Sequence, residues 1–278
     1  AVVAALLSIA VGPEKVLAVN MPTRHNTAKT KDAAAQIAES LGIGYVQIPI
    51  EDIVNANVEL IDGFDLDGSG RKLADSDYAE NVAAKIRGTS ILSNLAGKYG
   101  ALFTNNGNKT EVALGYATLY GDVGGAIVPI GDLTKREVFE LARYLNEEVF
   151  RREVIPEKLI PDELFRYRAD QVPSGPELKE KQVSQVKLGY HCALVEAMTA
   201  YMIKTPEGIM QWYLDGAMER NLGISTALIQ RWEMDKPAEF VKDLEWVMKK
   251  VQGNVFKRIQ SPPIIATSPT AFGYDRRE

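Results

Sequence analysis

The chain lacks several features that would assign it to other classes of protein. It has one cysteine in 278 residues, which excludes an intramolecular disulfide and suits a reducing cytosol. It has no concentrated stripe of lysine and arginine and a net charge of −5, so nucleic acid is not an expected partner. No apolar run is long enough to span a bilayer, and the apolar N-terminal segment lacks the charged front of a signal peptide. These absences predict a soluble, cytoplasmic protein without a membrane partner.

The apolar content of 46% is enough for one sizeable core, or one core with an appendage. In the first 150 residues, helical and strand-like patterns alternate. Helices are expected over 1–11, 27–41, 51–61, 76–99, 109–114 and 134–145, and strands over 15–19, 44–48, 101–103 and 126–129. Strands separated by helices imply right-handed crossovers and a parallel sheet covered on both faces. The sequence therefore predicts an α/β fold with a doubly wound parallel sheet.

The pattern changes after residue 146. A stretch rich in charge and proline, over about 147–181, has no clear period and predicts a long functional loop. Helices are expected over 184–204, 206–221, 225–234 and 237–257, followed by an irregular tail. We expect a nucleotide-binding α/β core over 1–150. Residues 151–278 would add the loop, a helical C-terminal extension and the tail to the same domain.

The most informative stretch is Gly107-Asn-Lys-Thr-Glu-Val-Ala-Leu-Gly-Tyr-Ala-Thr-Leu-Tyr-Gly-Asp122. It places the carboxylate of Glu111 at the start of a short helix and Asp122 in a glycine-rich loop. Small residues let the backbone approach a ligand closely, and a helix start offers free N–H groups to a phosphate. Both carboxylates are hard oxygen ligands of the kind that Mg²⁺ prefers. Taken alone, however, Glu111 is better explained as a first-turn acid that the helix dipole favours.

Together with Pro129-Ile-Gly-Asp-Leu-Thr-Lys-Arg-Glu-Val138, this stretch closely resembles the core of NAD synthetases, which are PP-loop ATP pyrophosphatases. Two C-terminal strings, Lys257-Arg-Ile-Gln-Ser-Pro-Pro263 and Ala271-Phe-Gly-Tyr-Asp-Arg-Arg277, resemble the end of the glutamine-dependent class. The resemblance covers nearly the whole chain and is strongest over 81–138. It implies an adenine nucleotide alpha-hydrolase-like, Rossmann-like fold. The implied reaction is ATP-dependent amidation of deamido-NAD to NAD through an adenylated intermediate, with release of AMP and pyrophosphate.

The resemblance also implies roles for single residues. Glu111 would ligate Mg²⁺ beside the ATP phosphates, Lys135 would contact these phosphates, and Asp122 would meet substrate or ammonium. A lysine in the first turn of a helix opposes the helix dipole unless an anion is bound there, which favours this role for Lys135. The other expected ATP contacts are Asn20, Met21, Asn106, Thr110 and Ser174. The expected deamido-NAD contacts are Asn81, Lys85, Arg87, Glu111, Tyr116 and Lys257.

The chain departs from the family pattern at three of these positions. Lys85 stands where an arginine is usual and lacks the bidentate fork of that residue. Asn106 stands where a threonine is usual, and Ser174 is followed by Gly-Pro in place of one alanine. A solvated helix face remains the alternative for residues 81–87, and a plain turn for the segment around Ser174.

The chain opens inside a helix that, in this family, follows a strand and a Ser-Gly-Gly-x-Asp-Ser pyrophosphate loop. We expect both to precede Ala1, so that the fragment alone is inactive or crippled. Ammonia would come from free ammonium or from glutamine, through an amidase domain upstream, and the protein would form at least a homodimer.

Two other functions stay open. One is another PP-loop ligase, such as a GMP synthetase, against which the C-terminal strings argue. The other is a non-catalytic dinucleotide-binding or assembly module, against which the retained Lys135 and Glu111 argue. His191 and Cys192 are neighbours on an expected helix, so their side chains diverge by about 100° and a role in the core is favoured.

Overall fold

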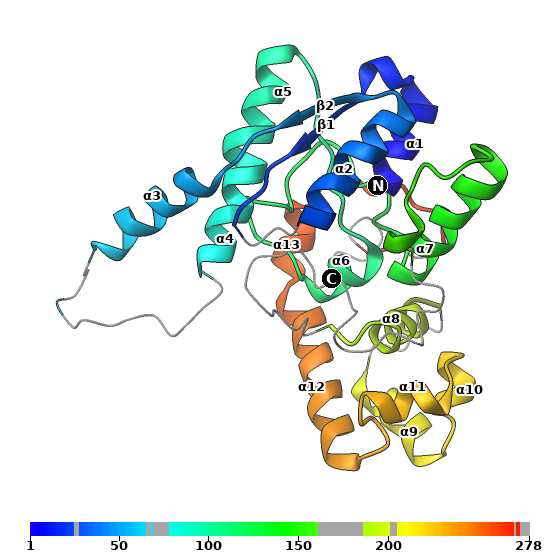
Figure 1. Ribbon diagram of the computed structural model, residues 1–278. Helices are drawn as coiled ribbons and strands as arrows, with labels where there is room; N and C mark the ends of the chain where they lie inside the picture. Colours follow the sequence, from blue (N-terminus) through cyan, green and yellow to red (C-terminus); the bar gives the residue numbers. More distant parts are fainter. Residues whose placement is uncertain are drawn as a thin grey trace.

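The computed structural model describes residues 1–24, 28–64, 68, 78–160, 186–200, 205–269 and 271–272. An α/β part formed by the first half of the chain lies above a group of C-terminal helices in Figure 1. Ser174, much of the expected loop over 147–181 and the tail beyond Phe272 lie outside the described residues. Within the described ranges, no helix is long and apolar enough to cross a membrane.

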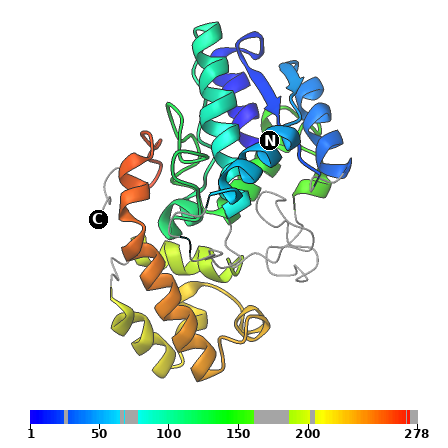
Figure 2. The ribbon, with the colours of Figure 1, turned by 90° about the vertical axis from the view of Figure 1, so that its left-hand side faces the viewer.

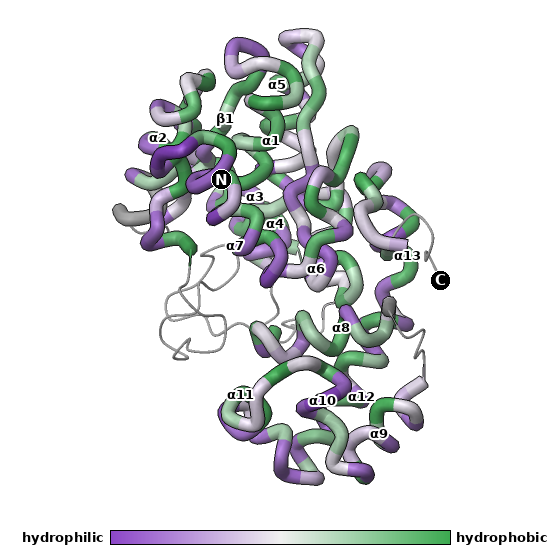
Figure 3. Tube along the Cα trace, turned by 90° about the vertical axis from the view of Figure 1, so that its right-hand side faces the viewer, coloured by the Kyte–Doolittle hydropathy of each residue, from purple (hydrophilic) through white to green (hydrophobic). Residues whose placement is uncertain are grey.

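The α/β part is built on two parallel strands. Helix α1 (Val2–Val11) and a 3-10 turn, η1 (Pro13–Lys15), lead into β1 (Leu17–Asn20). Helix α2 (Ala28–Leu41) then connects β1 to β2 (Gly44–Gln47), which lies parallel to it. A helical crossover of this kind is what a parallel pair requires. The almost wholly apolar sequence of α1, green in Figure 3, packs into a cluster with α2 and α7.

A long helical segment follows on the other side of the strands. Helix α3 (Glu51–Asp62) projects from the body of the molecule (Figure 1). Helix α4 (Tyr78–Lys85), a π-helical segment η2 (Ile86–Leu92) and α5 (Ser93–Tyr99) then run on without a break. The helix expected over 76–99 is therefore confirmed for its described part. Its wider π-helical turns were not predicted, and such turns occur often at functional sites.

The strands expected over 101–103 and 126–129 are not regular strands. Their backbones lie side by side, and the Phe103 carbonyl accepts a hydrogen bond of 2.8 Å from the Ala126 N–H. Gly125 has a φ of +133°, and a Cβ there would lie 2.8 Å from the facing backbone nitrogen. This close, irregular approach interrupts the ladder. Within the described residues, regular pairing is therefore limited to β1 and β2.

The rest of the chain is helical, with two corrections to the expected elements. The helix expected over 206–221 is broken at Gly216, whose φ is +61°, and the one expected over 237–257 is interrupted at Asn254. The helices that follow α5 are α6 (Lys109–Leu114), α7 (Lys135–Tyr144), α8 (Tyr190–Ala200), α9 (Pro206–Leu214), α10 (Met218–Leu222), α11 (Thr226–Arg231), α12 (Pro237–Gly253) and α13 (Val255–Gln260). Short turns, η3 (Leu145–Val149) and η4 (Glu157–Leu159), follow α7.

The largest apolar cluster joins the two parts of the molecule. Val112, Ala113 and Leu114 of α6 belong to the same cluster as Leu194 of α8 and Leu244 of α12. The short helix α6 thus packs on the C-terminal helices. As a result, the C-terminal helices are part of one continuous core with the segment that carries Glu111.

His191 and Cys192 are buried, as expected for residues of the core. The Nε2 atom of His191 lies 3.1 Å from Oδ2 of Asp243, and the ammonium group of Lys187 pairs with the same carboxylate. The ring of His191 also stacks on Trp246. These contacts fasten α8 to α12, which is a structural role.

Candidate functional site

A cavity of about 510 Å³ opens where the helical segment α4–η2, the loop after Phe103, α6 and the α12–α13 junction meet. Figure 2 shows α12 running up to α13, which lies beside the loop between α6 and Gly125. Eight residues predicted from the sequence line this cavity: Met21, Asn81, Arg87, Asn106, Glu111, Tyr116, Asp122 and Lys257. They come from distant parts of the sequence, from Met21 near the start to Lys257 near the end, and the fold brings them together.

Glu111 is fixed at the cavity by the start of α6. The side chain of Asn108 accepts hydrogen bonds from the N–H groups of Thr110 and Glu111, while Oε2 of Glu111 accepts one of 3.0 Å from the Asn108 N–H. This reciprocal capping box satisfies free donors at the helix start and explains why so short a helix forms here. It engages one carboxylate oxygen, Oε2, in the cap. Because the cap uses only this oxygen, the same side chain can cap the helix and also act as a metal ligand.

Asp122 lies in the glycine-rich loop opposite Glu111. Its Oδ1 accepts a hydrogen bond from the Thr118 N–H. Asp122 lines the cavity, and removal of its carboxyl group from water raises its pKa, although hydrogen bonds from backbone N–H groups partly oppose this effect. The charge of Glu111 raises this pKa further, and that of Lys257 lowers it. Asp122 therefore takes up a proton more readily than an ordinary aspartate.

The loop of Asp122 rests directly on the π-helical segment. A Cβ on Gly88 would lie 2.1 Å from the carbonyl oxygen of Gly121, so only a residue without a side chain fits at this contact. On the same side, Oδ1 of Asn81 accepts a hydrogen bond of 2.7 Å from the Thr118 hydroxyl. This contact couples the helix that carries Asn81 to the loop that carries Asp122.

Arg87 comes from the same helical segment and connects it to the end of β1. Its Nε donates a 3.3 Å hydrogen bond to the carbonyl of Met21, the residue after the strand. Burial lowers the pKa of Arg87, and the negative charge of Asp122 opposes this effect. The guanidinium group therefore supplies a partly desolvated positive charge close to Asp122.

The α12–α13 junction forms the opposite side of the cavity. Nζ of Lys257 donates hydrogen bonds of 2.9 Å and 2.7 Å to the carbonyls of Gly115 and Ala117. Burial lowers the pKa of Lys257, the charge of Lys250 lowers it further, and Asp122 raises it. The buried Arg258 donates a hydrogen bond from Nη1 to the carbonyl of Ala113, which holds α13 against α6.

A buried ion pair connects α6 to the C-terminal segment. Nζ of Lys109 lies 2.9 Å from Oδ1 of Asp132, and Oδ2 accepts hydrogen bonds from the N–H groups of Thr267 and Ser268. Burial by itself would raise the pKa of Asp132. Hydrogen bonds from Lys109, Ser268 and Thr267 outweigh it, and the pKa lies below its ordinary value. Neither Lys109 nor Asp132 was among the predicted site residues.

Four predicted site residues do not line the cavity: Asn20, Lys85, Thr110 and Lys135. Asn20 donates a 3.0 Å hydrogen bond to the hydroxyl of Tyr45. The buried hydroxyl of Thr110 points to Sγ of Cys192, at 3.4 Å. The predicted Ser174 lies outside the described residues.

Sequence reasoning missed several polar residues of the cavity: Glu80, Thr104, Asn105, Thr118, Lys250, Arg258 and Ser261. For Lys250 a signal existed, because it precedes Lys257 by two helical turns and residues so spaced share a helix face. For Thr118 and Asn105 the sequence held no comparable signal, since their roles depend on how the loop folds back on α4.

The charges of the cavity suit the binding of an anionic ligand. Four residues supply positive charge, namely Arg87, Lys250, Lys257 and Arg258, and three supply carboxylates, namely Glu80, Glu111 and Asp122. Among the described residues, no group of three or more typical metal ligands gathers at one point. Mg²⁺ usually takes only one or two carboxylates together with substrate phosphates, so this donor set fits that ion.

Comparison with known proteins gives consistent matches. The family model of NAD synthase matches residues 1–211. The glutamine-dependent NAD(+) synthetase of Thermotoga maritima is 29% identical over 99% of this chain and 41% of its own length. That of Xylella fastidiosa is 31% identical over 100% of this chain and 44% of its own length. The chain thus spans less than half the length of these relatives.

Solved structures agree in fold. A glutamine-dependent NAD+ synthetase from Acinetobacter baumannii, in complex with ADP, has a TM-score of 0.52 and 26% identity over 98% of this chain and 41% of that one. One from Cytophaga hutchinsonii has a TM-score of 0.60 and 19% identity over 94% of this chain and 37% of that one, and it supports the fold alone.

Proposed function

The chain belongs to the NAD synthase family, and on that premise we propose that it is the synthetase part of a glutamine-dependent NAD synthetase. The reaction would join ammonia to the nicotinate carboxylate of deamido-NAD at the expense of ATP. The observation that carries the proposal is the cavity, because residues predicted separately for ATP, deamido-NAD and metal binding line this one site. The match of the family model over most of the chain supports it further.

In this reaction, a carboxylate oxygen of deamido-NAD attacks the α-phosphate of ATP, and pyrophosphate leaves. Ammonia then attacks the acyl carbon and loses a proton, and AMP leaves. Both steps demand charge neutralisation and alignment rather than a nucleophilic side chain. Bound Mg²⁺ would supply Lewis-acid neutralisation of phosphate charge, with Glu111 as its proposed protein ligand.

The remaining residues of the cavity would bind and orient the substrates. Asn81, Arg87 and Lys257 would hold deamido-NAD, and Tyr116 would contact it from the loop after α6. Asp122 would meet substrate or ammonium, and its carboxylate would attract the ammonium ion when it is ionised. The ATP contacts proposed from the resemblance are Asn20, Met21, Asn106, Thr110, Lys135 and Ser174.

We also propose the context of this activity. An amidase domain would release ammonia from glutamine, as the names of the relatives suggest, and free ammonium would be an alternative source. The protein would act in the cytoplasm as a homodimer. Residues 1–150 and 151–278 would form one domain, because α6 and the C-terminal helices share the largest apolar cluster.

The test is turnover by the polypeptide at its complete natural length, given deamido-NAD, ATP, Mg²⁺ and ammonium. NAD and AMP should appear in equal amounts. Glu111→Gln keeps a side chain able to cap the helix but removes the charge, so turnover should fall by about 100-fold while the unfolding midpoint stays unchanged. Glu137→Gln is the matched control, because Glu137 has the same capping position in α7 and does not line the cavity.

Two outcomes would contradict the proposed reaction, and a third would contradict the role of Glu111. Amidation of xanthosine monophosphate with no NAD formed would identify another PP-loop ligase. Binding of deamido-NAD without any turnover would favour a binding module. Equal activity of Glu111→Gln and Glu137→Gln would remove Glu111 from the metal site.

A further inference from the structure

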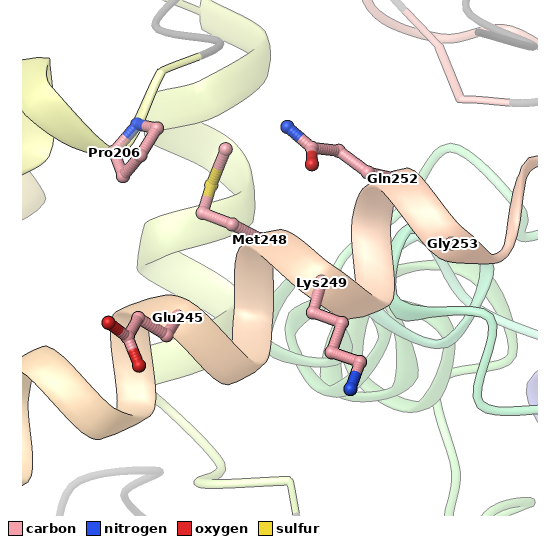
Figure 4. Close-up of a pocket in the computed structure, with 6 residues that line it drawn as sticks. All are labelled: Pro206, Glu245, Met248, Lys249, Gln252 and Gly253. Atoms are coloured by element: carbon pink, nitrogen blue, oxygen red, sulfur yellow. The ribbon is translucent and has the colours of Figure 1, made fainter.

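Helix α12 presents two adjacent lysines to different surroundings. Lys249 lies on a surface groove together with Pro206, Glu245, Met248, Gln252 and Gly253 (Figure 4). Lys250, the next residue, instead lines the cavity that contains Glu111 and Asp122. Adjacent helical residues diverge by about 100°, which accounts for the separation. The two lysines therefore form a natural pair for comparing a cavity charge with a surface charge.

Lys250 is half-buried and held in place by its own helix. Its Nζ lies 5.6 Å from the ring centre of Trp246, and that ring stacks on the buried His191 at 5.4 Å. In the part of the chain that the structure describes, no carboxylate forms an ion pair with Lys250. Its charge thus reaches the cavity without neutralisation from these residues.

Lys257 supplies a second charge on the same side of the cavity. Its two hydrogen bonds go to neutral carbonyl groups, and among the described residues its charge is likewise not neutralised by a direct ion pair. The charge of Lys250 lowers the pKa of Lys257, so the two ammonium groups interact unfavourably in the free protein. An anion bound beside both would attract each ammonium group and so offset the repulsion between them.

Asn254 fixes the positions of both lysines relative to α6. Its Nδ2 donates hydrogen bonds of 2.9 Å to the carbonyl of Lys250 and 3.0 Å to the carbonyl of Leu114. The amide thus spans the interruption between α12 and α13 and holds it against the end of α6. The cation pair is preorganised, which lowers the entropic cost of binding an anion.

We propose that Lys250 and Lys257 together form a subsite for a phosphate group of a substrate, and that Lys250 is a specificity-determining residue of this site. The proposal rests on the proposed function. The phosphates of the dinucleotide are the favoured occupant, because Asn81 and Arg87, proposed for the same substrate, line the same cavity. The phosphates of ATP are the other source of this chemistry.

The experiment compares Lys250→Gln with Lys249→Gln in the complete polypeptide. Lys250→Gln should raise the KM for deamido-NAD by about tenfold while kcat and the KM for ATP stay unchanged, because one charged hydrogen bond to substrate is lost. Lys250→Glu should raise the KM for deamido-NAD further. Lys250→Arg should return this KM to the wild-type value, since the positive charge is kept. Lys249→Gln should behave as the wild type, and unfolding midpoints establish that all variants fold.

Failure of the proposed function and failure of the subsite would give different results. A wild-type protein without turnover would contradict the proposed function, and calorimetric titration with deamido-NAD and with ATP would then test the subsite by itself. A rise in the KM or Kd for ATP alone would support the subsite and identify ATP as its occupant. The subsite would be overturned if the KM or Kd values for both ligands agreed within twofold between Lys250→Gln and Lys249→Gln.

Discussion

Asp132 is a buried carboxylate that accepts hydrogen bonds from several donors. It is 1% exposed, yet Lys109 and the backbone of Thr267 and Ser268 satisfy it. Such an arrangement is stable only while every partner is present, because a buried charge left alone is costly. At this scale, the charge on one side chain holds the C-terminal segment to the helix of Glu111.

We predict that Asp132→Asn lowers the free energy of unfolding by about 3 kcal/mol at neutral pH, because the buried charge of Lys109 loses the carboxylate that neutralises it. Chemical denaturation measures the loss. In the double variant Asp132→Asn/Lys109→Met, part of this stability should return. A double variant less stable than Asp132→Asn would contradict the explanation.

The same pair predicts a dependence on pH. Because the pKa of Asp132 is lowered in the folded protein, its contribution is complete above the unfolded value, about 3.9, and is lost as pH falls through the folded value. The difference between wild type and Asp132→Asn should therefore be constant from neutral pH down to about 5 and shrink below about 4. A difference that grows on acidification would contradict this assignment.

At the scale of elements, the junction between α6 and α12–α13 determines the shape of the cavity. Gly115 ends α6 with a φ of +60°, and a Cβ there would lie 2.2 Å from Cβ of Asn254. The carbonyl of the same glycine accepts a hydrogen bond from Lys257. The absence of a side chain at this position therefore permits three elements to meet.

We predict that Gly115→Ala destabilises the protein by about 2 kcal/mol, through the left-handed backbone and the clash with Asn254. Displacement of the junction should also raise the KM for deamido-NAD. Gly97→Ala is the control, because Gly97 lies in α5 with no atom within 4 Å of the added Cβ and no positive φ. That change should stabilise the protein by about 0.5–1 kcal/mol, and equal effects of the two substitutions would contradict the argument.

At the scale of the whole molecule, the C-terminal helices and α6 share one core. Leu244 of α12 is 2% exposed and belongs to the cluster that contains Val112 and Leu114 of α6. A core shared by α6 and the C-terminal helices couples the stability of these elements.

We predict that Leu244→Ala costs about 3 kcal/mol and that the protein still unfolds in a single transition. Hydrogen exchange should accelerate in α6 as well as in α12, because the two helices lose protection together. Val241→Ala, at an exposed site of α12, is the control and should change little. Faster exchange confined to α12 would instead indicate two independent units.

The local sequence was enough to predict most helices of the α/β part. The capping pairs Asn108 with Glu111 and Thr134 with Glu137 act within three residues, so their effect is visible in the chain itself. The family resemblance then located eight residues of the cavity. These features depend on short-range contacts or on a continuous motif, and both can be read without the fold.

Only the tertiary structure decided which side chains meet. Lys257 bonds to a carbonyl 142 positions away, and the interruption of the helix at Asn254 that permits this contact has no local cause as strong as a proline. Likewise, the hydroxyl of Thr110 turns to Cys192 because α8 packs on α6. The sequence by itself determined the helix caps and the motif over 107–122, since each depends on neighbouring residues. It also determined which kinds of functional group the site could contain. The cavity and the entry of Lys250 into it depended on packing between distant helices, which no local pattern specifies.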